Sequence, residues 1–304
     1  MGIAGLLLNQ IIIMFILMCI GFVFYKVKFI SNQGSKDIGK ILLYLVIPVV
    51  IVKNFMIERS AENVSALIHS VIISLVAMGI AILVSYVFFG KKDGVANFSS
   101  SFSNAGFIGI PLISATLGEG AVFYISMMIV LINALQWTYG VFVMSGDKSV
   151  MKPKAIITNP IVIAVLIGII LFISGIQLPV LVTDVFDLVS GLNTPLAMIV
   201  SGVYLAQCDL RAMLAKKNIY VVSLVRLVVI PLITLLAFVL LPIGNETIRM
   251  AVLIAAACPV GSNVAIFAEA YHSDYRSAVE QVCMTTILCL LTLPLIVAIA
   301  GMVL

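Results

Sequence analysis

The sequence predicts an all-α polytopic membrane protein with ten transmembrane helices. Of its 304 residues, 63% are hydrophobic and only 10% are charged, whereas soluble proteins are about 45–50% apolar and about 25% charged. A helix needs about 20 mainly apolar residues to cross the hydrocarbon core. The apolar stretches are continuous, not alternating as in a membrane β-barrel. The length therefore accommodates about ten spans with short loops and no separate soluble domain.

Apolar windows between polar breaks place the spans along the chain. The first is expected to be retained as a span, because no Lys or Arg precedes it and no small-residue cleavage pattern follows it. The fifth and sixth are separated by a polar connector at 146–154. The expected spans are 6–25, 38–56, 65–89, 97–117, 121–145, 155–174, 184–207, 218–241, 246–271 and 275–302.

Charge predicts the orientation of these spans. Thirteen of the seventeen Lys and Arg residues fall in the odd-numbered loops and their flanks, and three fall in the even-numbered ones. Positive charge marks the cytoplasmic side in short loops. We therefore expect both termini to be extracytoplasmic in a multi-pass protein of the cell membrane. The charges are dispersed along the chain and indicate no nucleic-acid partner.

The ten spans divide into two inverted halves, 1–146 and 155–304. An odd number of spans per half forces the halves into opposite orientations. Helix-disrupting residues recur at nearly one offset: Gly21 and Gly168 are 147 residues apart, Pro48 and Pro195 also 147, and Pro111 and Pro259 148. Inverted repeats of this kind are typical of secondary transporters.

Spans four and nine contain matched clusters of Asn, Gly and Pro near the expected bilayer midplane. A proline inside a helix removes one backbone hydrogen bond, at a cost of about 3 kcal/mol or more. Matched clusters favour two broken helices that cross, over the alternative of simple kinks with each Asn bonding a neighbouring helix. The residues are Asn104, Gly109 and Pro111 in span four, and Pro259, Gly261, Ser262 and Asn263 in span nine.

The expected breaks predict an anion site. Gly109 and Pro111 are expected to end one half-helix and begin the next, and Pro259 to do the same in span nine. The second half-helices would then point their positive N-terminal ends at the midplane. Two such ends suit a carboxylate, and Asn104 and Asn263 can add side-chain hydrogen bonds.

Two further charged residues are candidates for binding or coupling. Arg226 lies eight residues into span eight, where a central charge costs about 2.5–3.5 kcal/mol on insertion scales. It either binds or gates the substrate carboxylate, or it is structural, through snorkelling to the interface or pairing with Glu280. Glu269 either carries a coupling proton or lies at the cytoplasmic interface.

At these motifs the chain resembles the auxin efflux carrier family, which includes PIN-type auxin carriers and bacterial malate permeases. The resemblance covers essentially the whole chain in order. The matching stretches are Asn104–Leu112, Gln136–Gly140, Asn159–Pro160, Pro195–Ala197, Cys258–Asn263, Ala270–Tyr271 and Leu293–Pro294.

The resemblance implies a fold like that of the sodium–bile acid symporters, with crossover helices four and nine. Spans one, two, six and seven would form a scaffold that mediates a homodimer, and spans three to five and eight to ten a transport domain that moves like an elevator. It also implies polar contacts to substrate near Asn133 and Gln136. The connector at 146–154 is short, so regulation through the long loop of plant carriers is not implied.

The function expected is secondary transport of a small organic anion, such as malate or an auxin-like acid, by efflux. Alternatives are a sodium- or proton-coupled symporter or antiporter of the same fold and, more remotely, a non-transporting sensor. An enzyme is not expected, because the sequence has no HExxH motif, no Gly-x-Ser-x-Gly elbow and no obvious catalytic Asp pair within the spans. Its five cysteines form no CxxC or Cys/His pair, and no metal or cofactor is expected.

Overall fold

The computed structural model describes residues 3–147, 153–176, 178–209 and 213–304. Within these ranges the protein is helical, and its only β pairing is an isolated bridge between two residues. Six helical segments are long and apolar enough to cross a membrane, and two shorter apolar helices, Ala105–Leu117 and Pro160–Ser174, lie between them. The prediction of an all-α, multi-pass membrane protein is confirmed in these terms.

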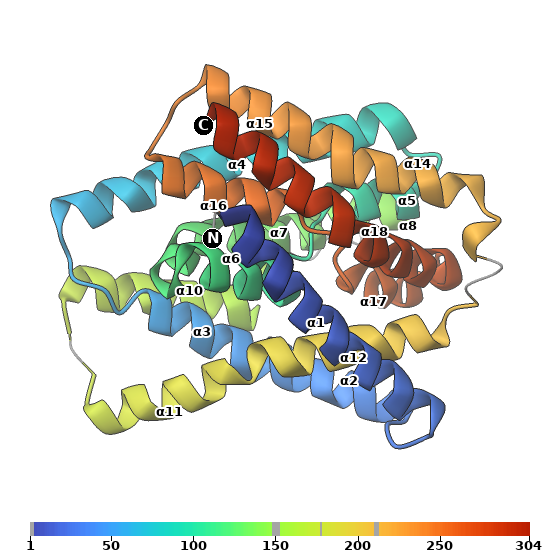
Figure 1. The fold of residues 1–304 in the computed structure, drawn as a ribbon, viewed down its shortest axis with the longest axis horizontal. Coiled ribbons are helices and arrows are strands. Elements are labelled where there is room, and N and C mark those ends of the chain that lie inside the picture. Colours follow the sequence, from blue (N-terminus) through green and yellow to red (C-terminus); the bar gives the residue numbers. More distant parts are fainter. Residues whose placement is uncertain (1–2, 148–152, 177, 210–212) are drawn as a thin grey trace.

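Helical residues occur in each of the ten expected ranges (Figure 1). The first half contains α1 (Ile3–Lys26), α2 (Asn32–Ile41), η1 (Leu42–Val46), α3 (Ile47–Asn54), α4 (Ala61–Phe89), α5 (Gly94–Ser101), η2 (Ala105–Gly109), α6 (Ile110–Leu117), η3 (Glu119–Ala121), α7 (Val122–Leu135), η4 (Gln136–Gly140) and α8 (Val141–Ser145). The second half contains α9 (Pro153–Ile157), α10 (Pro160–Ser174), α11 (Val180–Gly191), α12 (Asn193–Gln207), α14 (Lys217–Leu224), η6 (Val225–Val229), α15 (Ile230–Leu240), α16 (Glu246–Ala257), α17 (Asn263–Ala270) and α18 (Tyr275–Val303).

Three prolines lie inside continuous helical runs because a π-helical turn precedes each of them. The turns η1, η2 and η6 end two residues before Pro48, Pro111 and Pro231. In each case the residue just before the proline donates its N–H to a carbonyl five residues back. A proline ring clashes with the carbonyl four residues back in a regular α-helix. The wider turn ahead of the ring lets the helix continue.

Two pairs of helices cross closely at glycines. On α1, a Cβ added at Gly21 would overlap the backbone carbonyl of Ile199 on α12, and these helices cross in Figure 1. On α10, a Cβ added at Gly168 would lie 2.7 Å from the Phe55 ring at the end of α3. Small residues let the backbones of membrane helices approach. The two glycines that the sequence relates by 147 residues are thus both contact positions.

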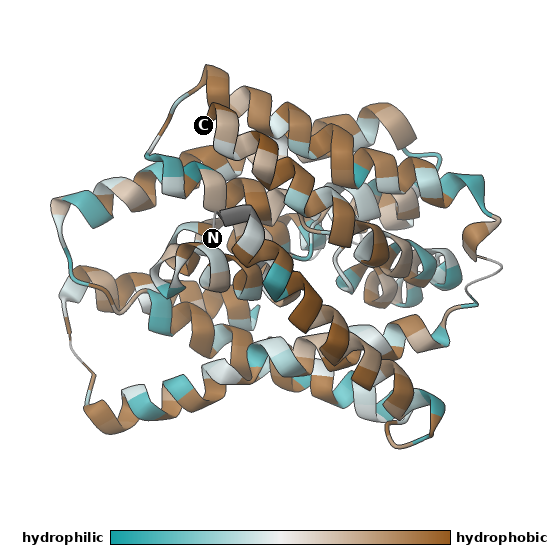
Figure 2. Ribbon diagram, in the orientation of Figure 1, coloured by the Kyte–Doolittle hydropathy of each residue, from teal (hydrophilic) through white to brown (hydrophobic). Residues whose placement is uncertain are grey.

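The outer surface of the bundle is apolar, as a lipid-facing surface requires. Large hydrophobic side chains are exposed along α1, α4, α10 and α15, including Ile16 on α1, Leu83 on α4 and Ile170 on α10. In Figure 2 the helices are predominantly hydrophobic, and hydrophilic residues gather at helix ends and in connecting loops. Buried polar side chains occur on several helices, and one group of them, including Ser103, Asn104 and Ser262, lies where two helices are interrupted.

Candidate functional site

The two interrupted helices are joined to each other by main-chain hydrogen bonds. The N–H of Asn104 donates to the carbonyl of Pro259 at 2.8 Å, and the N–H of Gly261 donates to the carbonyl of Phe102 at 3.0 Å. Ser103 and Val260 between them form the isolated antiparallel bridge. The gap between α5 and η2 and the gap between α16 and α17 therefore satisfy each other's backbone groups at membrane depth.

The break in the first of these helices does not lie where the sequence predicted it. Gly109 and Pro111 are both inside the helical run from Ala105 to Leu117, and the chain is non-helical at Phe102–Asn104 instead. The turn η2 accommodates Pro111 without interrupting the helix. In the second helix the break at 258–262 contains Pro259, as the sequence predicted.

Two helix N-termini meet at the crossing. Asn104 is the N-cap of η2, and its side-chain oxygen accepts from the N–H of Phe107 at 3.3 Å. Ser262 occupies the same place at the start of α17, without a side-chain capping bond. The first N–H groups of a helix have no acceptor within that helix. These N–H groups and the helix dipoles give both ends partial positive charge.

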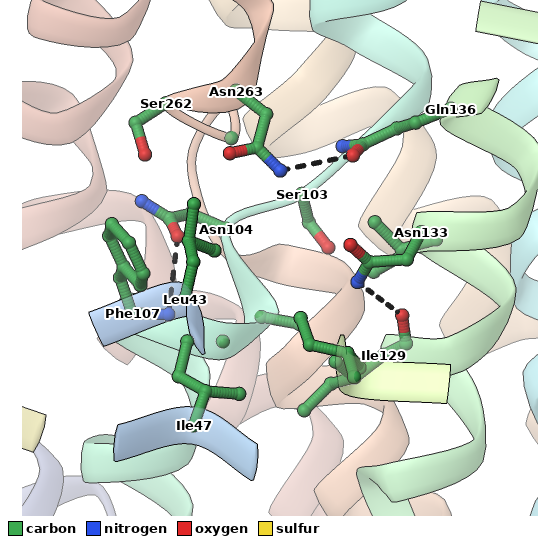
Figure 3. Close-up of a pocket in the computed structure, with 15 residues that line it drawn as sticks. Leu43, Ile47, Ser103, Asn104, Phe107, Ile129, Asn133, Gln136, Ser262 and Asn263 are labelled. Atoms are coloured by element: carbon green, nitrogen blue, oxygen red, sulfur yellow. Dashed lines mark hydrogen bonds between the residues drawn. The ribbon is translucent and has the colours of Figure 1, made fainter. Parts of the chain in front are cut away.

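A small cavity of about 40 Å³ lies between these N-termini and the polar part of span five (Figure 3). Six of the predicted site residues line this one cavity together. They are Asn104, Asn133, Gln136, Gly261, Ser262 and Asn263. The remaining lining residues are Leu43, Ile47, Ser103, Ala105, Gly106, Phe107, Ile129, Ile132 and Ile161.

Side-chain amides dominate the polar wall of this central cavity. Asn263 donates from Nδ2 to Oε1 of Gln136 at 3.1 Å, and Asn133 donates to the carbonyl of Ile129 at 2.8 Å. Asn159 reaches Oδ1 of Asn133 at 3.5 Å. Asn104 and Gln136 use their oxygens in these bonds, which leaves their amide nitrogens available as donors among the residues that line the cavity. Amide donors beside two positive helix ends suit an anionic group.

Two larger cavities adjoin the central one on the side of α2. They measure about 200 and about 270 Å³, and both share Leu43 and Asn263 with it. Lys40 lines both and Lys36 lines the first. Lys40 lies 2.9 Å from Asp37, and this hydrogen bond lowers the pKa of the Asp37 carboxyl from its ordinary value. The approach to the amide-lined cavity thus passes two ammonium groups.

Three predicted residues lie near the crossing but do not line the central cavity. Gly109 packs against α16, where a Cβ added to it would lie 3.4 Å from the sulfur of Cys258. Pro259 contributes the carbonyl that bonds Asn104. Pro111 lines a separate cavity of about 420 Å³, together with Lys53, whose ammonium bridges carboxylates at 3.0 and 2.8 Å. Those carboxylates belong to Glu119 and Asp187.

Arg226 lies behind the crossing instead of in the cavity. Its side chain is buried, only 1% exposed, and it donates to the carbonyls of Ser100 at 2.8 Å, Cys258 at 3.2 Å and Ala256. Both structural expectations for it were wrong, since it neither snorkels nor pairs with Glu280. Glu280 bonds Lys216 and Arg276 instead.

Glu269 lies at the rim of the approach. Its side chain is 60% exposed and pairs with Lys36 at 3.5 Å. Glu269 therefore lies outside the central cavity, in an exposed ion pair. Among the described residues, no group of three or more His, Cys, Asp or Glu is placed to hold a metal ion.

The sequence did not identify several residues that shape the site. Leu43 and Ile47 are apolar side chains in span two, and nothing in their pattern distinguishes them from lipid-facing neighbours. Asn159 carried a signal, as a polar residue directly before a helix-starting proline, but its contact with Asn133 depends on the packing of α10 against span five. Ser103 could be found only once the break was known to lie at Phe102–Asn104.

Comparison with known proteins identifies the chain's relatives at the family level. The model of a family described as membrane transport protein matches residues 6–297. A search of curated proteins found no match. The matched range runs from most of α1 to most of α18, and it contains both interrupted helices and the whole of the central cavity.

Proposed function

We propose, from the premise that this chain belongs to the membrane transport protein family that includes the auxin efflux carriers, that it is a secondary transporter of a small organic anion. The substrate class is a carboxylate, such as malate or an auxin-like acid. The central cavity lined by Asn104, Gln136 and Asn263 is its binding site.

The single observation that carries this proposal is the charge character of the central cavity. Two helix N-termini and amide donors face it, and no carboxylate side chain is among the described residues that line it. Such donors bind an anion without a buried positive side chain in contact with it. Lys36 and Lys40 line the approach and are paired there with Glu269 and Asp37, so the preference for an anion rests on the donors of the central cavity.

The transporter is proposed to have ten spans in two inverted repeats, 1–146 and 155–304. The equivalent glycines support this, since Gly21 packs span one against span seven and Gly168 packs span six against span two. These four spans form the proposed scaffold, through which we propose a homodimer. Spans three to five and eight to ten form the proposed transport domain, which carries the crossing across the membrane in an elevator-type movement.

The proposed direction is efflux from the cytoplasm. In the proposed orientation the Lys-rich loops face the cytoplasm, with α2 and its cavities on that side and both termini outside. Moving one negative charge outward across 100 mV gains about 2.3 kcal/mol, so the membrane potential alone can drive export. A sodium- or proton-coupled symporter or antiporter using the same site is the alternative mechanism, and a non-transporting sensor is a more remote one.

The test is flux in proteoliposomes that contain the purified protein and radiolabelled malate. We expect saturable malate flux whose direction follows an imposed potassium-diffusion potential in sodium-free buffer at equal pH on both sides. The matched comparison is Asn104→Ala, which removes a cavity donor and should reduce the flux without changing thermal stability by more than a few degrees.

Three outcomes separate the alternatives. Flux that appears only with a sodium gradient or only with a pH gradient identifies the corresponding coupled mechanism. Absence of saturable flux for a panel of mono- and dicarboxylates, in protein that melts cooperatively, overturns the proposal of organic-anion transport. Flux unchanged in Asn104→Ala removes the crossing cavity as the binding site.

A further inference from the structure

Arg226 connects the ends of both interrupted helices. Ser100 lies at the end of α5, and Ala256 and Cys258 lie at the end of α16. All three carbonyls accept from the Arg226 guanidinium, whose side chain comes from the π-helical turn η6 in a third helix. The last carbonyls of a helix carry partial negative charge and lack intrahelical donors. Such carbonyl clusters coordinate cations in transporters with broken helices.

The charges at the crossing do not cancel once Arg226 is counted. Two N-terminal ends contribute about half a positive charge each, and two C-terminal ends about half a negative charge each. These four ends sum to roughly zero, and the guanidinium adds one full positive charge. Among the described residues Arg226 forms no salt bridge. The crossing as a whole is therefore positive, with its negative ends masked and its positive ends facing the cavity.

We propose that Arg226 is a tethered cation that determines the anion specificity of the crossing. It occupies the carbonyl cluster where a metal cation would otherwise bind, and it acts on the substrate through the backbone without touching it. This inference rests on the proposed function, because it explains why the same site prefers a carboxylate. It also accounts for binding of an anion without a bound sodium ion.

Two of the carbonyls that the guanidinium bonds lie close along the chain to residues that line the cavity. Cys258 is followed within three residues by Gly261, which lines the cavity, and Ser100 is followed within three residues by Ser103, which lines it too. Thr285 on α18 holds the same break from the other side, accepting from the N–H of Val260 at 3.1 Å. Arg226 and Thr285 thus fix the peptide groups that form the back of the site.

The test compares purified Arg226→Gln and Arg226→Lys with the wild type and with Arg249→Gln. Arg249 is the control, because its guanidinium also donates to main-chain oxygens, those of Phe238 at 3.3 Å and Leu304 at 3.1 Å, but away from the crossing. The probes are malate and its uncharged diamide, titrated in a thermal-stability assay, since a ligand that binds the folded state raises its stability. The ratio of the two apparent affinities measures charge selection.

We expect the preference for malate over the diamide to fall about tenfold or more in Arg226→Gln. In Arg226→Lys, which retains the cation, and in Arg249→Gln, this preference should stay within about threefold of the wild-type value. If Arg226 had only a structural role, its loss would weaken the binding of malate and of the diamide equally and leave the ratio of their affinities unchanged. An unchanged ratio in Arg226→Gln, or a lost ratio in folded Arg226→Lys, overturns the proposal.

A second measurement needs no substrate. Arg226→Ala leaves the carbonyl cluster without its cation, so millimolar guanidinium chloride should raise its melting temperature relative to choline chloride at equal ionic strength. Wild type and Arg249→Ala should show no such rise. If guanidinium raises the melting temperature of Arg226→Ala while no carboxylate raises that of wild type, the role of Arg226 as a tethered cation is supported and the proposal of organic-anion transport is overturned. If guanidinium has no specific effect on the melting temperature of Arg226→Ala, the proposed role of Arg226 as a tethered cation is overturned, whatever the wild type transports.

Discussion

The amide of Asn263 donates to the amide of Gln136 at 3.1 Å, and this bond joins the start of α17 to the π-helical turn η4. The two residues are 127 positions apart in the chain and come from different halves of it. Their bond joins two side chains that both line the central cavity (Figure 3).

The first prediction concerns charge at this wall. Asn263→Asp keeps the size of the side chain but places a carboxylate beside the proposed anion. Two like charges about 4 Å apart repel by about 4 kcal/mol at an effective dielectric constant of about 20. We expect malate flux in proteoliposomes to fall about a hundredfold or more. Gln33→Glu, which adds the same charge on the exposed first turn of α2, is the control and should retain most of the flux.

A second prediction concerns the cavity that Pro111 lines. Lys53 bridges Glu119 and Asp187 there, and Glu119 is 72% exposed. An exposed ion pair contributes about 0.2–1 kcal/mol. Losing it in Glu119→Gln should therefore raise the fraction of molecules in which this cavity is open to solvent by at most about fivefold. We expect faster labelling of Ser114→Cys by an impermeant thiol reagent in this background. Asp184→Asn, on the same helix as Asp187 but outside the ion pair, should leave the labelling rate unchanged.

A third prediction uses two cysteines in contact. Cys208 follows α12 and Cys283 lies on α18, with their sulfur atoms 2.8 Å apart. Mild oxidation should join them, as detected by mass spectrometry of the linked peptides, and Cys283→Ser should prevent the link. Because α12 belongs to the proposed scaffold and α18 to the transport domain, the disulfide should stop flux until it is reduced. Full flux through fully linked protein would contradict a relative movement of these helices.

A fourth prediction concerns the crossing of α1 and α12. Gly21→Ala places a methyl group against the Ile199 backbone, and overpacking of this kind costs about 1–3 kcal/mol. We expect a lower melting temperature in detergent. Gly301→Ala is the comparison, because a Cβ there meets no atom within 4 Å, and its melting temperature should equal that of wild type or exceed it slightly. Equal melting of both variants would show that the close crossing is not maintained.

The sequence predicted the composition of the site better than its geometry. Asn104 and Asn263 could be singled out because amides are rare in apolar spans and these two recur in matched clusters, whereas Gln136 was indicated only by the family resemblance. The break at Phe102–Asn104 could not, because Pro111 disrupts a regular helix but not one preceded by a π-helical turn, and that turn depends on tertiary packing. The place of Arg226 was missed for a related reason. Its partners are backbone carbonyls, which every residue has and no residue type signals.

The crossing itself is made by main-chain atoms: Asn104 bonds Pro259, Gly261 bonds Phe102, and neither bond depends on a side chain. A frame of this kind tolerates replacement of the side chains around it. Single substitutions of the amide and apolar side chains of the cavity should therefore leave the two helix ends at the crossing in place. Under the proposed function, the main-chain frame would provide the attraction for an anion, and the side chains around it would determine which anion binds.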